Sequence, residues 1–344
     1  MGYAKAHISS AVVQRVARAV GNLGLPMSPL IDRLSSPRPD LCFYGLAPPK
    51  LSTPAERVQA IVAAQKERLR ALGPDALVVY DLQDESARQA EPRPFPFLPT
   101  LAPDIYAHEL MADLPLAKIV YRSVAATGRA TFERWLKDVD NVAPAEPRFS
   151  VLVGAPASRV GSPQGLALKE AYALARRHAP ALVLGAIAIA ERHTRRGDEH
   201  ERMLSKAASG CRFFVTQAVY DASSSKSLLS DYARAARARG LNPMPVVLTF
   251  SPCGSPRTLA LLKWLGIAVP RWLENELLDA RDTLDTSVRL AEEIAEDVLA
   301  FAHARHIPVG INVESVSIRK EEIEAATALF IALRERIRRA KPTT

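Results

Sequence analysis

Residues Leu184–Asp221 read LGAIAIAERHTRRGDEHERMLSKAASGCRFFVTQAVYD. An apolar run at 182–189 ends in a polar turn at 190–193, and a charged segment with helical character follows at 197–208. After a glycine turn, a second apolar run at 212–216 ends at Gln217. Strand, loop, helix, turn and strand in this order form the repeating unit of a parallel α/β protein. Ligands of such proteins bind where strands end, so Glu191, His193 and Gln217 are the first candidates for a site.

The same unit repeats along the chain. Apolar runs with strand character occur at 41–46, 76–80, 117–121, 149–153, 182–189, 212–216, 245–250 and 309–313, with helical segments between them. Eight strands that alternate with helices, and no linker after Asp40, predict one (β/α)8 TIM barrel over residues 41–344. A doubly wound sheet is the alternative, but no Gly-x-Gly-x-x-Gly follows any strand.

Residues 1–40 precede the barrel pattern. Segment 8–20 has helical spacing, and four prolines then interrupt the chain. Closely spaced prolines interrupt regular secondary structure. We therefore predict an N-terminal helical arm and linker over 1–40, which covers the bottom of the barrel or packs on a partner.

The composition is that of an ordinary globular protein, with 48% hydrophobic and 24% charged residues. No apolar run reaches the roughly 18 residues that a membrane span needs. No secretory signal is evident, and three isolated cysteines argue against a disulfide framework, so a cytoplasmic protein is expected. No cysteine pair has zinc-ligand spacing, and no metal site is expected. The net charge of +8 is spread over helical arginines without a nucleic-acid motif, so no nucleic-acid partner is expected.

Two stretches carry a resemblance to a known family. Residues 185–221 and the segment FYGLAPPK at Phe43–Lys50 are similar to the methylenetetrahydrofolate reductases. That family shows Gly-Gly-Ala-Tyr, Pro-Glu-x-His, Lys-x-x-Ala-Gly-Ala and Thr-Gln-x-x-Phe-Asp in the first stretch and FEFFPPK in the second. The order and spacing of these short motifs carry the resemblance, which extends more weakly from about residue 41 to the last helix.

The resemblance implies an enzyme of one-carbon metabolism and methionine biosynthesis. The family reduces 5,10-methylenetetrahydrofolate to 5-methyltetrahydrofolate, usually by passing a hydride from NAD(P)H to bound FAD and then to the folate. It also implies that the chain forms homo-oligomers.

The resemblance assigns roles to individual residues. Gln217 matches the glutamine that hydrogen-bonds the pterin, and an amide at a strand end suits a heterocycle with paired donors and acceptors. Two further residues near strand ends are assigned to the folate with it: Tyr220 and Phe250. His193 matches a flavin-contacting histidine and Lys206 a basic residue near the flavin phosphates; Arg122 is assigned to the cofactor with them, because basic residues suit phosphate partners.

The chain departs from the family at two acidic positions. The family's acid in FEFFPPK, the proposed proton donor that opens the substrate to its iminium form, is replaced by Gly45. The family's Arg-Gly-Asp-Pro-Pro after strand four reads Val153-Gly154-Ala155-Pro156 here, so an aspartate near the flavin and the pterin is Ala155. Glycine and alanine cannot transfer protons. A replacement acid would have to come from three candidates at strand ends: Glu314, Asp81 and Tyr44.

Three hypotheses follow from these departures. In the first, which we favour, the chain is a divergent member that has lost FAD and reduces the folate directly with NAD(P)H, as flavin-free members of the family do. In the second, it keeps a folate site but performs methyl transfer or another one-carbon reaction without hydride transfer. In the third, it is a non-catalytic folate-binding or partner protein on the same scaffold. Fold alone does not choose among them.

Overall fold

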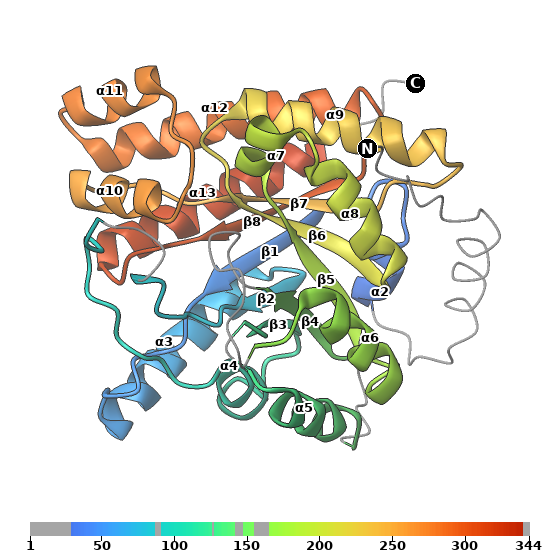
Figure 1. The fold of residues 1–344 in the computed structure, drawn as a ribbon. Helices are drawn as coiled ribbons and strands as arrows, with labels where there is room; N and C mark the ends of the chain where they lie inside the picture. Colours follow the sequence, from blue (N-terminus) through green and yellow to red (C-terminus); the bar gives the residue numbers. More distant parts are fainter. Residues whose placement is uncertain (1–28, 87–90, 126, 142–146, 155–164, 340–344) are drawn as a thin grey trace.

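The structure is a computed structural model that describes residues 29–86, 91–125, 127–141, 147–154 and 165–339. Eight parallel strands pair in chain order and close into a barrel, with β1 hydrogen-bonded to β8 (Figure 1). This confirms the predicted (β/α)8 TIM barrel. The strands are β1 Leu41–Leu46, β2 Ala76–Val79, β3 Ala117–Ser123, β4 Phe149–Val153, β5 Val183–Ala188, β6 Cys211–Ala218, β7 Val246–Phe250 and β8 Val309–Glu314.

Helices surround the barrel (Figure 1). Some begin or end with signals that the sequence supplies: Gly73, in the left-handed region, ends α3, and Asp221 caps α9 by accepting from the backbone N–H groups of Ser223 and Ser224. The helices are α2 Pro29–Leu34, α3 Ala55–Leu72, α4 Pro103–Ile105, the π-helical turn η2 Tyr106–Leu110, α5 Arg129–Asn141, α6 Leu168–His178, α7 Ala190–Arg196, α8 Glu199–Ala208, α9 Ala222–Ala238, α10 Pro256–Trp264, α11 Arg271–Asp279, α12 Thr283–His303 and α13 Lys320–Arg339.

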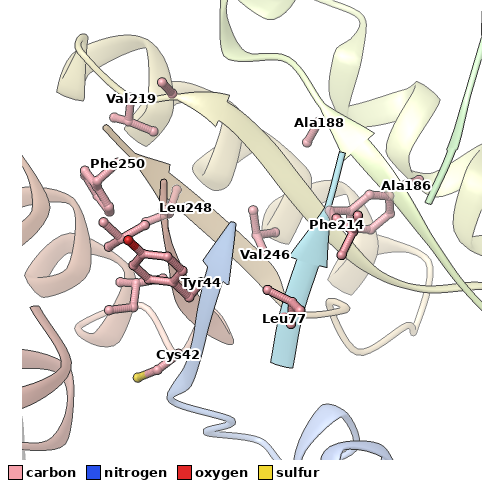
Figure 2. Packing of buried hydrophobic residues seen from close by; sticks show 14 of the residues in the cluster. Cys42, Tyr44, Leu77, Ala186, Ala188, Phe214, Val219, Val246, Leu248 and Phe250 are labelled. Carbon is pink, nitrogen blue, oxygen red and sulfur yellow. The ribbon is translucent and has the colours of Figure 1, made fainter. Parts of the chain in front are cut away.

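Strand alternation divides the apolar residues into two layers. In β1, Phe43 packs inside the barrel with Val78 and Phe213, whereas Tyr44 packs outside, against the helices. Figure 2 shows part of the outer layer, in which Tyr44, Leu248 and Phe250 are buried together with residues of other strands. Since successive strand residues point to opposite faces, this alternation decides which polar residues reach the interior of the barrel.

The described part of the predicted arm closes the bottom of the barrel. Leu30 and Leu34 of α2 are buried in the interior cluster, against residues at the beginnings of the strands such as Leu41. Arg33 pairs with Asp75, directly before β2, and donates to the carbonyl oxygens of Pro39 and Asp40. These contacts leave the opposite end of the barrel, where the strands finish, as the open mouth.

The structure corrects several expected elements. The polar turn expected at 190–193 is the helix α7, which ends at Gly197 in the left-handed region. Strands β6 and β8 extend further than expected, so Gln217 and Glu314 lie within strands rather than beyond them. The segment between β2 and β3 contains a short α-turn followed by a π-helical turn. The predicted helix at 8–20 and Ala155 lie outside the described residues. Among the described helices, none is long and apolar enough to cross a membrane.

Candidate functional site

The mouth of the barrel holds a chain of hydrogen-bonded polar side chains. Tyr80 follows β2, and its hydroxyl donates to the carboxylate of Glu314 at the end of β8. The same hydroxyl accepts from Asn312 Nδ2 at 2.8 Å. Asn312 and Glu314 are two residues apart on β8, so both side chains point to the barrel interior. Together, these three residues place one carboxyl group at the end of the barrel where the strands finish.

Glu314 is a carboxyl group with an unusual proton affinity. Burial at the barrel mouth raises the pKa of its carboxyl from 4.5 to about 7, against the opposing effect of the hydrogen bond from Tyr80. Removal from water disfavours the charged form of a carboxyl group. A carboxyl group with a pKa near neutrality exists in both protonation states at physiological pH, which is the property that a general acid needs.

Gly45 makes room for this arrangement. Gly45 and Glu314 are register partners across the β1–β8 pairing. A Cβ atom at position 45 would lie 2.8 Å from the Tyr80 hydroxyl oxygen and 3.2 Å from Glu314 Cβ. The place of a side chain at position 45 is therefore filled by Tyr80 and Glu314.

The polar chain continues across the barrel from Asn312. Asn312 is fully buried, and its Nδ2 also lies 3.3 Å from Thr249 Oγ1 on β7. Thr249 in turn donates to the carbonyl oxygen of Thr216 at 2.9 Å, and Thr216 Oγ1 accepts from the backbone N–H of Thr249. This series of hydrogen bonds holds the side chains of Tyr80 and Asn312 in one orientation relative to Glu314.

Asp81 follows Tyr80, two residues after the end of β2. Its Oδ2 accepts from the backbone N–H of Ser123 at 2.7 Å, and its Oδ1 accepts from Gln83 Nε2 at 2.7 Å. Burial raises the pKa of the Asp81 carboxyl, although these hydrogen bonds oppose the shift. Asp81 therefore joins β2 to the end of β3.

Gln217 lies in β6, directly after Thr216, and is partly exposed. It lines a small hollow together with Glu191, Tyr220 and Asp221. Glu191 Oε1 accepts from the backbone N–H of Ala268 at 3.3 Å, and burial raises the pKa of its carboxyl. The structure thus brings Gln217 and Glu191 together beside the mouth, as the strand-end argument expected.

Two of the candidates, Tyr44 and Phe250, face away from the barrel interior, whereas Tyr220 lines the hollow beside Gln217. Tyr44 is buried against the Phe330 ring of α13, with ring centroids 5.8 Å apart, and Phe250 belongs to the same outer layer (Figure 2). The Tyr220 hydroxyl donates to the carbonyl oxygen of Ser251 at 2.7 Å. Tyr44 and Phe250 occupy outward-facing positions because of strand alternation, which the prediction from strand ends did not resolve. The structure does not bring them to Glu314.

The three cofactor candidates lie in three separate places. Arg122 points outward from β3, pairs with Asp104 at 3.2 Å and lies over the Trp135 ring of α5. Lys206 of α8 donates to the carbonyl oxygen of Ile187 at 2.5 Å and lies 3.4 Å from the buried Glu199. His193 of α7 contacts Asp231 of α9. These residues do not fit a common site for FAD, and we derive no step through a flavin.

Sequence reasoning missed Tyr80, Asn312 and Thr249. The signal for Asn312 was present, since a lone amide stands in the apolar strand VGINV two residues before Glu314. Tyr80 ends the apolar run ALVVY, and its hydroxyl could not be placed without knowing the neighbouring strands. Residues two apart on a strand share a face, so the Asn-x-Glu spacing predicts a shared orientation.

Comparison with known proteins places the chain in a family with a solved structure. No protein-family model matches the chain, and no curated protein matches it. A solved structure from Clostridium thermocellum, described as an uncharacterized protein that binds two copies of 5-methyl-5,6,7,8-tetrahydrofolic acid, is 37% identical, with a TM-score of 0.78. The match covers 90% of this chain and 99% of that chain. The chain belongs to the family of this protein. A thermostable xylanase mutant from Cellvibrio japonicus is 8% identical over 86% of this chain, with a TM-score of 0.47, a likeness too weak to bear on function.

Proposed function

We propose that the chain binds a reduced folate at the barrel mouth and reduces 5,10-methylenetetrahydrofolate to 5-methyltetrahydrofolate with NAD(P)H, without a flavin. Glu314 is the general acid of this reaction. The folate is supported by the relative from Clostridium thermocellum, which binds the methylated product of the same reaction. The reductase step is supported by the sequence resemblance together with the carboxyl group at the mouth.

The observation that carries the proposal is the position of Glu314. The reductase family places its acid on the first strand, where this chain has Gly45. Glu314 is the register partner of Gly45, and with Tyr80 it borders the space that a side chain at position 45 would take. A carboxyl group is therefore supplied from β8 instead of β1, with a pKa of about 7 that suits proton donation.

The proposed chemistry balances with one proton and one hydride. Protonated Glu314 donates its proton to N10 of the folate as the bond between N10 and the bridging methylene carbon breaks. The electron pair of that bond goes to N10, and an iminium cation forms at N5. NAD(P)H then transfers a hydride to the methylene carbon, which yields the 5-methyl group and NAD(P)+. Glu314 recovers its proton from solvent.

Gln217 is the proposed partner of the pterin. Its amide can both donate and accept, which matches a ring system that carries both kinds of group along one edge. Glu191, which lines the same hollow, and Asp81, which follows β2, are further carboxyl groups whose pKa values burial raises. Several such groups at the end of one barrel are typical of an active site.

Equilibrium binding tests the folate part of the proposal. Titration of the purified chain with 5-methyltetrahydrofolate should give saturable binding, and Gln217→Leu should weaken it by about tenfold or more, as expected for loss of a hydrogen-bonding side chain. The outward-facing Phe250→Leu is the control and should leave the affinity within about threefold, because it removes no polar partner. Failure of the wild-type chain to bind any reduced folate would contradict the proposal.

Methyl transfer is a second candidate, because the folate in the relative carries the 5-methyl group. That molecule is the product of the reductase and the donor in a methyl transfer. Tight binding of 5-methyltetrahydrofolate without folate-dependent oxidation of NADH or NADPH would favour methyl transfer or a purely binding role. Folate-dependent oxidation would favour the reductase.

A further inference from the structure

We propose that His193, His200 and Asp231 bind a divalent transition-metal ion, for which Zn²⁺ is the best match, on the outer side of the barrel. The three residues come from α7, α8 and α9, which pack against one another beside β5 and β6 (Figure 1). The site is separate from the mouth of the barrel and was not expected from the sequence, where only cysteine spacing was considered.

The geometry of the three side chains suits a shared ion. One ligand atom from each residue lies within 4.8 Å of the other two. His193 Nε2 lies 3.1 Å from Asp231 Oδ2, and the imidazole rings of His193 and His200 meet edge to face with centroids 5.3 Å apart. Zinc bonds to nitrogen and oxygen are about 2.0–2.2 Å long, so two ligands of one ion lie about 3–3.5 Å apart.

Two buried ring nitrogens in this group have no partner among the described residues. They are Nδ1 of His193 and Nδ1 of His200. The His193 side chain is only 6% exposed, so bulk water does not satisfy its ring. A buried imidazole nitrogen without a partner is costly, and it is satisfied by a proton acceptor, a water molecule or a metal ion. An ion bound through His193 Nε2, the atom 3.1 Å from Asp231, would leave His193 Nδ1 as it is, so His200 Nδ1 is the unpartnered nitrogen that the ion would satisfy.

The donor set decides the class of ion. Two imidazoles and one carboxylate match the ligands of Zn²⁺ sites with three protein ligands, whereas Mg²⁺ and Ca²⁺ prefer oxygen ligands alone. Asp231 is 52% exposed, which gives the ion a route from solvent and leaves a position for water. Glu201, 3.6 Å from His200 Nε2, adds negative charge and is itself held by Arg239.

An ion here would act on the candidate folate site through α7. His193 stands two residues after Glu191, which lines the hollow beside Gln217. Fixing His193 to α8 and α9 would hold α7, and with it Glu191, in one position. We therefore assign the ion a positioning role. This role rests on the proposed folate site, whereas metal binding itself does not.

Calorimetric titration of the full-length chain, stripped with a chelator, with ZnCl₂ tests the site. We expect one Zn²⁺ per chain and a higher melting temperature when the ion is bound. Even outer-shell partners of metal ligands change affinity by about 10–100-fold. Asp231→Asn and His200→Gln, at the more exposed ligands, should therefore each weaken binding by at least about tenfold.

His303→Gln is the matched control. His303 faces Asp40 at 3.7 Å, a histidine and carboxylate pair without a second histidine, and this variant should bind Zn²⁺ like the wild type. Absence of Zn²⁺ binding would overturn the proposal, as would binding that both ligand variants retain at full affinity. If a ligand variant loses Zn²⁺ binding but keeps the wild-type affinity for 5-methyltetrahydrofolate, the metal site is supported. Only the positioning effect of the ion on the folate site is then contradicted.

Discussion

Gly45 on β1 and Glu314 on β8 are paired residues of adjoining strands, and a Cβ atom on Gly45 would lie 3.2 Å from Glu314 Cβ. Tyr80 fills the remaining space, with its hydroxyl oxygen 2.8 Å from the same point. The glycine on β1 and the glutamate on β8 are thus two parts of one arrangement. The position that is glycine here could not carry a glutamate while Tyr80 keeps its place.

Gly45→Ala tests this packing directly. The added methyl group would overlap Tyr80, whose ring is held by Tyr121 at a centroid distance of 4.9 Å. We expect a loss of about 1–3 kcal/mol in the free energy of unfolding, as for other overpacked sites, and a fall in folate-dependent activity. Denaturant unfolding and the oxidation assay measure the two effects. Gly254→Ala is the control. Its added methyl group would contact the side chain of Glu322 rather than Tyr80, so the pH dependence of activity should stay as in the wild type. Unchanged stability in Gly45→Ala would show that Tyr80 does not occupy this space.

Glu314→Gln should change how stability depends on pH. The pKa of Glu314 is raised in the folded chain from 4.5 to about 7, so its contribution to stability is complete below pH 4.5 and is lost as the pH rises through 7. The full shift corresponds to about 3 kcal/mol, and partial contact with solvent reduces this to about 1–2 kcal/mol. Urea unfolding at pH 5 and pH 8.5 should therefore show the wild type losing more stability than Glu314→Gln over this interval. Equal losses in the two proteins would mean that Glu314 titrates as an ordinary exposed carboxyl group.

Tyr80→Phe should move the pH profile of activity upward. The Tyr80 hydroxyl stabilises ionised Glu314, so its removal raises the pKa of the carboxyl further. Activity that depends on protonated Glu314 is present at low pH and falls above its pKa, and the falling limb should shift to higher pH in the variant. The variant also leaves Asn312 Nδ2 without one acceptor, at a cost of about 1–3 kcal/mol. Tyr172→Phe, at a buried position on α6, is the control, and the falling limb of its pH profile should stay at the wild-type pH. A limb that moves to lower pH would contradict the assignment.

Glu199→Gln should act on stability rather than on ligand binding. Glu199 is fully buried and lies 2.7 Å from Arg192 and 3.4 Å from Lys206. Removing its charge leaves three cations without this partner, the third being Arg202 at 3.6 Å, and should cost about 3–5 kcal/mol. Glu201→Gln, which breaks the half-exposed pair with Arg239, should cost less than about 1 kcal/mol. Thermal unfolding of the two variants measures the contrast. Selective loss of nicotinamide or flavin affinity in Glu199→Gln, with stability unchanged, would show that Lys206 belongs to a cofactor site.

The fold was predictable because periodicity and turn residues repeat locally. Each apolar run from Leu41 to Val313 became a strand, and Gly73 and Asp221 mark helix ends as their types suggest. Helix α7 was missed because its seven residues are mostly polar and have the composition of a turn. Its end at Gly197 was the available signal.

The candidate site was only partly predictable. Glu314 and Gln217 lie near the ends of β8 and β6 and Asp81 follows β2, positions that can be predicted from strand ends alone, and their roles stay predictions. Tyr44 and Phe250 lie in the outer layer, because the side chains of successive strand residues point to opposite faces, and the strand-end rule does not say which face a residue takes. The contact between Tyr80 and Glu314 joins residues 234 positions apart (314 minus 80), and no local pattern records it.

The most direct test of the account is anaerobic oxidation of NADH or NADPH by the purified wild type and Glu314→Gln, followed at the nicotinamide absorbance band with and without 5,10-methylenetetrahydrofolate. The account predicts oxidation that requires the folate, in a preparation without a flavin spectrum. It also predicts that Glu314→Gln loses about 100-fold or more of the rate while still binding 5-methyltetrahydrofolate. Folate-dependent oxidation that persists at the wild-type rate in Glu314→Gln would contradict the role of Glu314. Absence of oxidation in the wild type with folate bound would contradict the reductase.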